Sequence, residues 1–213
     1  MNELEDIAEK VEKGKNIEVP EATRKALEKG IPPYEILING LQAGLAVVGD
    51  RFKRGEAFIP EVLLSARAMH AGMDLLRPFL AETGTKPIGK VILGTVKDDL
   101  HDIGKNMVGM MLEGAGFQVI DIGINVSVEK FVETVRKEKA DILGMSALLS
   151  TTMPFLRTTI EGLKENGLRD QIQVLVGGAP VTEDYAMEIA ADGYAPDAAS
   201  AVDKAKELLN ANA

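Results

Sequence analysis

The segment from Lys97 to Asn106 contains polar side chains at a spacing that suits metal binding. It places a carboxylate, Asp99, two residues before His101, and Gly104 three residues after that histidine. A neutral imidazole is a good ligand for a borderline transition metal. Metal-bound histidines usually donate their other ring N–H to a carboxylate, which fixes the tautomer. The spacing therefore indicates a metal ligand, His101, supported by Asp99.

The chain offers His101 no companion ligands in the later loops. It has no cysteine, so thiolate metal sites and disulfides are excluded. The other histidine, His70, falls in a helical pattern and is interpreted as a boundary or solvent residue. A metal at His101 would have to arrive with most of its ligands attached, as in a tetrapyrrole-like macrocycle. An isolated Asp-x-His is more often a polar loop with a helix cap, so its place in the fold has to decide.

From Lys90 onward the sequence predicts alternating strands and helices. The strands are expected at 91–96, 118–122, 142–146, 173–176 and 193–195, and the helices at 104–115, 127–139, 154–166, 182–190 and 198–211. Near-continuous apolar strands separated by helices indicate a parallel sheet covered on both faces. The expected fold class is α/β, a doubly wound, flavodoxin-like sheet. Ligands bind beyond the carboxyl ends of its strands, where His101 would lie.

Two other strand ends point to the same ligand. Ser146 to Met153 follows the third strand and offers several small hydroxyls and no charge. Gly177 and Gly178 follow the fourth, where missing side chains let a bulky ligand lie against the backbone. Hydroxyls can also cap a helix and paired glycines can form a turn. Together with His101, however, these loops predict a ligand slot.

Before residue 85 the apolar period is helical. Four helices with short polar connections predict a small antiparallel bundle over residues 1–85. The third is expected from about Pro33 to Phe52 and the fourth from about Pro60 to Leu80. The segment from Thr83 to Gly89 has linker composition and is expected to act as a hinge, with residues 89–213 forming the sheet domain.

Composition limits the partners. Lys and Arg total 24 against 33 Asp and Glu, a formal net charge of −9, and no basic cluster stands out. Nucleic-acid binding needs a basic face, so no nucleic-acid partner is expected. The apolar runs are far shorter than the ~20 residues that span a bilayer, so no membrane partner is expected and the protein is assigned to the cytoplasm.

Taken together, the motifs resemble a known family. Asp99-x-His101-x-x-Gly104, Ser146-x-Leu148 and Gly177-Gly178 resemble the signature of cobalamin-binding domains that bind the cofactor base-off, with histidine on cobalt. The segment from His101 to Asn106 is similar to the methylcobalamin branch, which includes methionine synthase and the small corrinoid methyl-carrier proteins of methyltransferase systems. The sequence from Phe52 to Pro60 is similar to the helical cap of that branch.

The resemblance implies a role for each motif residue. His101 would be the axial ligand of cobalt in a cobalamin or related corrinoid, and Asp99 would hydrogen-bond to it. In the cap, Phe52, Ile59 and Val62 would cover the upper face of the cofactor. The family usually has Gly where this chain has Asp98; if the position needs a positive φ, Asp tolerates it better than most residues. The implied cofactor-binding residues are Asp99, His101, Asp102, Ile103, Gly104, Ser146, Leu148, Ser150, Thr151, Gly177 and Gly178.

The function implied is that of a methyl carrier that is not active alone. It would accept a methyl group on Co(I) from a donor-specific methyltransferase and pass it from methyl-Co(III) to a second methyltransferase, whose acceptor would be tetrahydrofolate or coenzyme M. The implied partners also include a reductive activation protein. The alternative is a cobalamin-dependent sensor or regulatory binding protein, which would need a DNA-binding module.

Three other classes fit less well. A signalling receiver needs an aspartate at the end of the third strand, where this chain has Met145 and Ser146. The cobalamin subunit of a carbon-skeleton mutase would share the histidine motif but lack the helical cap. A dinucleotide-binding enzyme would carry G-x-G-x-x-G after the first strand, and this chain does not.

Overall fold

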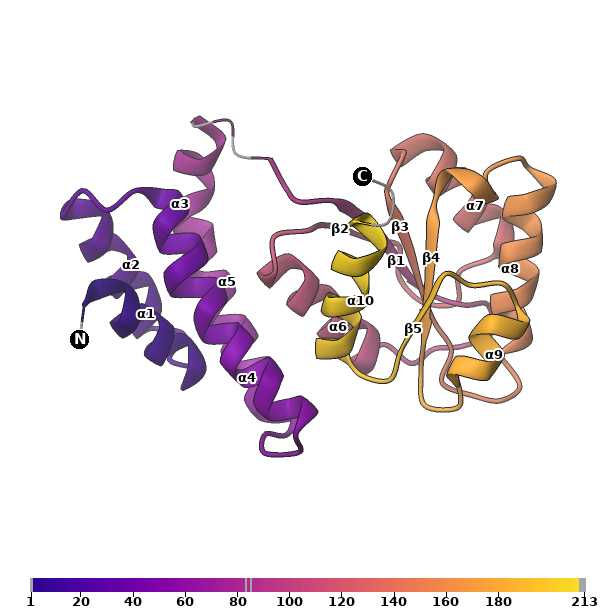
Figure 1. Ribbon diagram of the computed structural model, residues 1–213, viewed down its shortest axis with the longest axis horizontal. Helices are drawn as coiled ribbons and strands as arrows, with labels where there is room; N and C mark the ends of the chain where they lie inside the picture. Colours follow the sequence, from indigo (N-terminus) through magenta and orange to yellow (C-terminus); the bar gives the residue numbers. More distant parts are fainter. Residues whose placement is uncertain (1, 83, 85, 211–213) are drawn as a thin grey trace. The chain divides into compact units, whose positions relative to one another are not determined.

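The computed structural model describes residues 2–82, 84 and 86–210, which fall into two compact units, residues 1–86 and 87–213 (Figure 1). The expected hinge from Thr83 to Gly89 falls partly outside this range, since Thr83 and Thr85 are not among the described residues. No helix within the described ranges has the length and apolar character needed to cross a membrane.

The N-terminal unit is helical, as predicted. It contains α1 (Glu3–Glu12), α2 (Glu18–Glu28), a continuous run of α3 (Pro33–Glu35), η1 (Ile36–Gln42) and α4 (Ala43–Lys53), and then α5 (Ile59–Glu82). Asn2 caps α1: its side chain accepts from the Glu5 N–H, and the Glu5 carboxylate accepts from the Asn2 N–H. Ile7 and Val11, in the predicted apolar stripe of α1, are fully buried.

The third predicted helix is right in extent but not in geometry. Its segment η1 is a π-helix, which the sequence pattern did not reveal. The segment around η1 packs closely on α1, because the residues that face α1 include glycines. A Cβ on Gly44 would lie 2.4 Å from the carbonyl oxygen of Ala8, and one on Gly40 would lie 3.0 Å from Ile7. Larger residues at these two positions would push α1 away.

The second unit contains the predicted parallel sheet. Its strands are β1 (Lys90–Thr95), β2 (Gln118–Asp121), β3 (Ile142–Ser146), β4 (Gln173–Gly177) and β5 (Gly193–Ala195). All neighbours pair in parallel in the order β2-β1-β3-β4-β5, which is the flavodoxin-like order. The register pairs Thr95 with Ser146, and Ser146 with Gly177, so the carboxyl ends of β1, β3 and β4 lie side by side.

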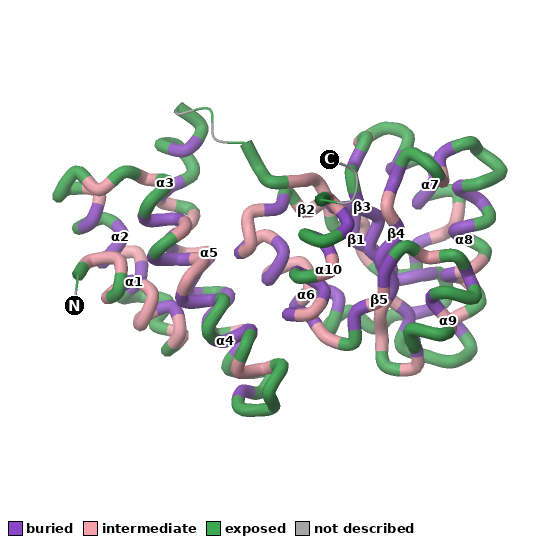
Figure 2. Tube along the Cα trace, in the orientation of Figure 1, coloured by how far each residue is buried: buried purple, intermediate pink, exposed green. Residues whose placement is uncertain are grey.

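Helices cover both faces of this sheet, which buries most residues of the central strands β1, β3 and β4 (Figures 1 and 2). α6 (Ile103–Gly114) and α10 (Ala198–Asn210) pack together on one face, and α7 (Val128–Glu138), α8 (Pro154–Glu165) and α9 (Glu183–Glu188) lie on the other. A short 3-10 turn, η2 (Arg169–Gln171), precedes β4. The core beneath α7 and α8 contains Phe131, Leu143, Leu156 and Leu163, all fully buried.

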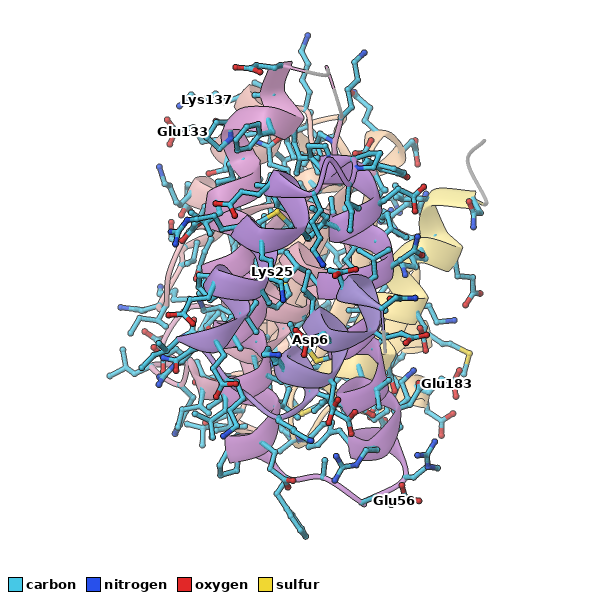
Figure 3. The ribbon with its side chains drawn as sticks, turned by 90° about the vertical axis from the view of Figure 1, so that its left-hand side faces the viewer. Asp6, Lys25, Glu56, Glu133, Lys137 and Glu183 are labelled. Carbon is cyan, nitrogen blue, oxygen red and sulfur yellow. The ribbon has the colours of Figure 1, made fainter. Side chains whose placement is uncertain are left out.

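Exposed charged side chains lie on the helices and loops of the bundle, as Lys25 on α2 and Glu56 in the loop before α5 illustrate (Figure 3). On α7, Glu133 and Lys137 are exposed at a spacing of four residues, while Phe131 and Val135 at the same spacing are buried. This amphipathic pattern is the reason α7 packs on the sheet with one fixed face.

Candidate functional site

Three loops meet at the carboxyl ends of β1, β3 and β4, and they contain most of the predicted site residues. The loop after β1 leads from Val96 to the start of α6, the loop after β3 leads to α8, and the loop after β4 leads to α9. The strand register brings the first residues of these loops together. In open parallel sheets this edge is the usual place for a ligand.

Asp99 is the most constrained residue at this edge. Its side chain is completely buried. Its Oδ1 accepts from the His101 backbone N–H at 3.1 Å and lies 2.8 Å from Nδ1 of the His101 ring. Its Oδ2 accepts from the Leu148 N–H at 2.7 Å and from the Thr152 hydroxyl at 2.7 Å. The carboxylate thus ties the loop after β1 to the loop after β3.

These contacts set the charge of Asp99. Burial raises the pKa of this carboxyl, but the hydrogen bonds from Leu148, Thr152 and His101 outweigh burial and lower the pKa to about 2. Asp99 is therefore ionised at neutral pH. An ionised carboxylate can only accept hydrogen bonds, so every group that contacts it must donate.

The charge of Asp99 determines which nitrogen of His101 can bind a metal. Since Asp99 only accepts, Nδ1 of the neutral ring carries the proton and Nε2 keeps its lone pair. The His101 side chain is 50% exposed, so the ring remains accessible. Its backbone carbonyl accepts from the Thr95 hydroxyl at 3.0 Å, which fixes the loop to the end of β1. The neutral His101 ring thus has an unprotonated Nε2 that could bind a metal.

Asp98 and Thr152 also fix the conformation around Asp99. Asp98 has a φ of 61°, so the position does need the left-handed backbone that Asp tolerates. Thr152 is a functional residue that sequence reasoning missed: it is buried and donates to Asp99, whereas the predicted Ser150 and Thr151 are exposed. Three hydroxyl residues in a row gave no signal of which one faces Asp99.

The two glycines at the end of β4 lie close to neighbouring backbone: Gly178 approaches the loop after β3, and Gly177 approaches β5. Gly178 has a φ of 127°, and a Cβ there would lie 1.9 Å from the carbonyl oxygen of Ala147. A Cβ on Gly177 would lie 3.0 Å from the carbonyl oxygen of Ala195. Ser146 is half-buried opposite Gly177, and Leu148 is 39% exposed. The two loops can pack this closely only because Gly178 has no side chain.

Comparison with known proteins agrees with this geometry. Family models described as B12 binding domain match residues 89–203 and residues 3–77. The chain belongs to the B12-binding corrinoid protein family.

Relatives of this corrinoid protein match along nearly its whole length. Dimethylamine corrinoid protein 3 of Methanosarcina acetivorans is 46% identical and aligns over 97% of this chain and 96% of its own. Trimethylamine corrinoid protein 1 of the same organism is 42% identical over 89% of this chain and 88% of its own.

Solved structures give the same result. A cobalamin-binding protein from Desulfitobacterium hafniense matches with a TM-score of 0.82 and 32% identity over 98% of this chain and 99% of its own. The methanol:cobalamin methyltransferase complex of Methanosarcina barkeri contains a chain that matches with a TM-score of 0.84 and 32% identity, covering 98% of this chain and 80% of that one.

The surface around His101 suits a corrinoid. The side chains of Leu100 and Ile103, near His101 in the chain, are 67% and 66% exposed, so this loop presents apolar surface. Asp102 and Gly104 are also exposed, and the Asp102 carboxylate accepts from the Asn106 amide at 3.0 Å. Leu100 was not among the predicted residues, although an apolar residue in so polar a loop could have indicated it.

The donor set fits a metal that brings its own ligands. In the part of the chain that the structure describes, no group of three or more histidines and carboxylates could hold a metal ion. His101 could supply one ligand to such a metal, and a corrin would supply the others. The residues of the sheet unit therefore fit this cofactor.

The predicted cap residues of the corrinoid protein differ in exposure. Ile59 is 43% exposed and Phe52 is partly buried, so both present apolar surface. Val62 is fully buried, and its side chain therefore belongs to the core. Phe58, which the prediction passed over, is 69% exposed and precedes α5 directly. It is a further candidate for the same role.

Proposed function

We propose that this corrinoid protein is a methyl carrier of a methyltransferase system. The observation that carries the proposal is the arrangement of His101: an accessible imidazole whose Nε2 lone pair is fixed by a buried, ionised Asp99. The relatives named as dimethylamine and trimethylamine corrinoid proteins support the same role. The protein would not act alone, because a carrier needs enzymes that load and unload it.

When bound, the corrinoid supplies a cobalt centre that accepts and gives up a methyl group. His101 would bind the cobalt from below, and Asp99 would keep the ring in the tautomer that leaves Nε2 unprotonated. Asp102, Ile103 and Gly104 would contact the corrinoid beside the ligand. A slot for its nucleotide tail would be formed by Ser146, Leu148, Ser150, Thr151, Gly177 and Gly178.

We assign the cofactor to residues 89–213 and the protection of its upper face to residues 1–85. Phe52 and Ile59 would exclude water from the upper face, with Val62 supporting them from the bundle core. The protein loaded with methylcobalamin should lose its methyl group in light faster when Phe52 and Ile59 are both changed to Ala. Phe79→Ala, at an exposed aromatic further along α5, is the matched control. Equal photolysis rates in all three proteins would contradict the assignment.

The proposed partners are a donor-specific methyltransferase, an acceptor methyltransferase and a reductive activation protein. The names of the relatives put dimethylamine and trimethylamine first among the donors to test, followed by methanol. The acidic charge balance favours a soluble protein, and we propose the cytoplasm as its location.

The cofactor ligand can be tested directly by electron paramagnetic resonance of the protein loaded with cob(II)alamin. Labelling histidine with ¹⁵N should change the superhyperfine splitting, and His101→Ala should abolish that change. Splitting from the benzimidazole nitrogen of the cofactor instead would refute the proposal. Methyl transfer with a panel of donor methyltransferases then separates a carrier from a sensor, since a sensor would bind corrinoid without passing on a methyl group.

A further inference from the structure

Asn125, in the loop between β2 and α7, contacts the backbone on both sides of Asp99. Its backbone N–H donates to the Asp99 carbonyl oxygen at 3.0 Å. Its side-chain Oδ1 accepts from the Asp98 backbone N–H at 2.8 Å. One residue of a neighbouring loop therefore fixes the chain just before and just after the carboxylate that holds His101.

The backbone at both partners is unusual. Asp98 has a φ of 61° and Asn125 a φ of 51°, and neither is a glycine. Left-handed backbone in such residues costs free energy and persists where surrounding contacts hold it. Asn and Asp are the side chains that tolerate it best. Two left-handed residues bonded to one another across two loops indicate a specific arrangement of the His101 loop.

The rest of the β2–α7 loop holds Asn125 in place. Thr95 donates from its backbone N–H to Gly123 and accepts from the Val126 N–H, both at 3.0 Å, and Val96 forms an isolated parallel bridge with Val126. The loop is thus bonded along the end of β1. Asp99 is then fixed from two directions, with its carboxylate held from the β3 side and its backbone from the β2 side.

We propose that Asn125 is a positioning residue for His101. It holds the left-handed backbone of Asp98 and the carbonyl of Asp99, directs the Asp99 carboxylate at the ring, and so keeps Nε2 unprotonated and correctly placed. The predicted effect of Asn125 on corrinoid binding rests on the proposed function. Its predicted effect on the tautomer of the His101 ring in the ligand-free protein does not depend on that function.

Three variants separate this role from a merely structural one. Asn125→Gly keeps the left-handed backbone and the N–H donor but removes the side chain, and with it the Oδ1 acceptor of the Asp98 N–H. Asn125→Asp keeps an oxygen acceptor at the same position and should rescue the loss. Ser127→Ala is the matched control: Ser127 caps α7 from the same loop by accepting from the Lys130 N–H, and its side chain makes no bond to the His101 loop.

The first measurement is ¹⁵N NMR of the histidine side chains in the ligand-free protein, at one fixed pH at which the spectrum of each variant shows a neutral His101 ring, with His70 as an internal reference. Wild type, Asn125→Asp and Ser127→Ala should show His101 in a single Nδ1-protonated form. Asn125→Gly should show a mixture of tautomers. A His101 spectrum unchanged in Asn125→Gly would overturn the proposal.

The second measurement is the affinity for cobalamin, followed by the spectral change from base-on to base-off. Asn125→Gly should bind about 10-fold more weakly, the lower end of the loss seen when groups that support a metal ligand are removed. Asn125→Asp should recover most of that loss, and Ser127→Ala should bind as wild type does although it is less stable. Equal loss in Ser127→Ala would show a general effect of the loop and overturn the proposal. If wild type itself bound no cobalamin, the proposed function would fail, and the NMR comparison would still decide the role of Asn125.

Discussion

Asp99→Asn replaces the buried carboxylate with an amide of the same shape and removes one of its two acceptor oxygens. Donors reach both oxygens of Asp99: two groups of His101 on Oδ1, and the Leu148 N–H and Thr152 hydroxyl on Oδ2. The amide NH₂ must therefore face donors in either orientation. Facing His101, it would favour the tautomer with the proton on Nε2; facing Leu148, it would leave a backbone N–H without an acceptor.

The size of the effect follows from the pKa. Folding lowers the pKa of Asp99 from 3.8 to about 2. At about 1.4 kcal/mol per pKa unit, the folded state favours the ionised form by about 2 kcal/mol. Because the folded pKa lies below the unfolded one, this contribution is complete above pH 4 and is lost as the pH falls through about 2. We expect Asp99→Asn to lower the free energy of unfolding by about 2 kcal/mol or more at pH 7.

Urea denaturation followed by circular dichroism measures this loss. The difference between wild type and Asp99→Asn should stay constant from pH 7 to about 4 and narrow below that, since wild-type Asp99 then becomes neutral as well. Asp102→Asn, at an exposed carboxylate beside the same histidine, is the control and should change stability by less than about 0.5 kcal/mol. A variant as stable as wild type at pH 7, or a difference that does not narrow in acid, would refute the reasoning.

Three further predictions concern the same loops. His101→Ala should change the free energy of unfolding by less than about 1 kcal/mol, because the ring is half exposed. It should nevertheless weaken corrinoid binding more than Asp99→Asn does, for which a loss of about 10–100-fold is typical. Equilibrium dialysis measures corrinoid binding in both variants. Asp98→Val should destabilise the protein by about 1–2 kcal/mol in thermal denaturation, because a β-branched residue does not tolerate a φ of 61°, while Asp98→Gly should not. Gly178→Ala should lower the free energy of unfolding by more than about 3 kcal/mol or prevent folding, since its Cβ would lie 1.9 Å from a carbonyl oxygen. Gly177→Ala should lower it less, because its Cβ would lie 3.0 Å from the nearest carbonyl oxygen. Similar unfolding midpoints for the two variants would contradict this.

The sheet could be predicted closely from the sequence because its central strands, β1, β3 and β4, are buried on both faces. β3 was predicted over the same residues that the structure gives, Ile142–Ser146, and the helix predicted at 127–139 is α7, Val128–Glu138. Continuous apolar runs and capping residues such as Ser127 mark such elements directly. The place of His101 followed from the strand order, since ligand loops meet at the carboxyl ends of parallel strands.

Other features depend on contacts between distant segments, and the sequence carried no sign of them. Thr152 and Asn125 reach Asp99 or its neighbour from loops 53 and 27 residues away in the chain. The π-helical turn of η1 does not change the apolar pattern enough to be recognised. Val62, by contrast, lies in an apolar stripe with Ala66, Met69 and Leu76, and all four are buried, as that helical period indicates.

The hydrogen bonds around Asp99 link the stability of the sheet unit to the tautomer and orientation of the His101 ring. A half-exposed imidazole would otherwise sample both tautomers and several ring orientations, and only one combination can bind a metal through Nε2. The donors that lower the pKa of Asp99 keep it ionised, and the ionised carboxylate selects that combination before any cofactor binds. Stability and ligand geometry should therefore fall together in Asp99→Asn and separate in His101→Ala, which removes the ligand but leaves the carboxylate with its donors from Leu148 and Thr152.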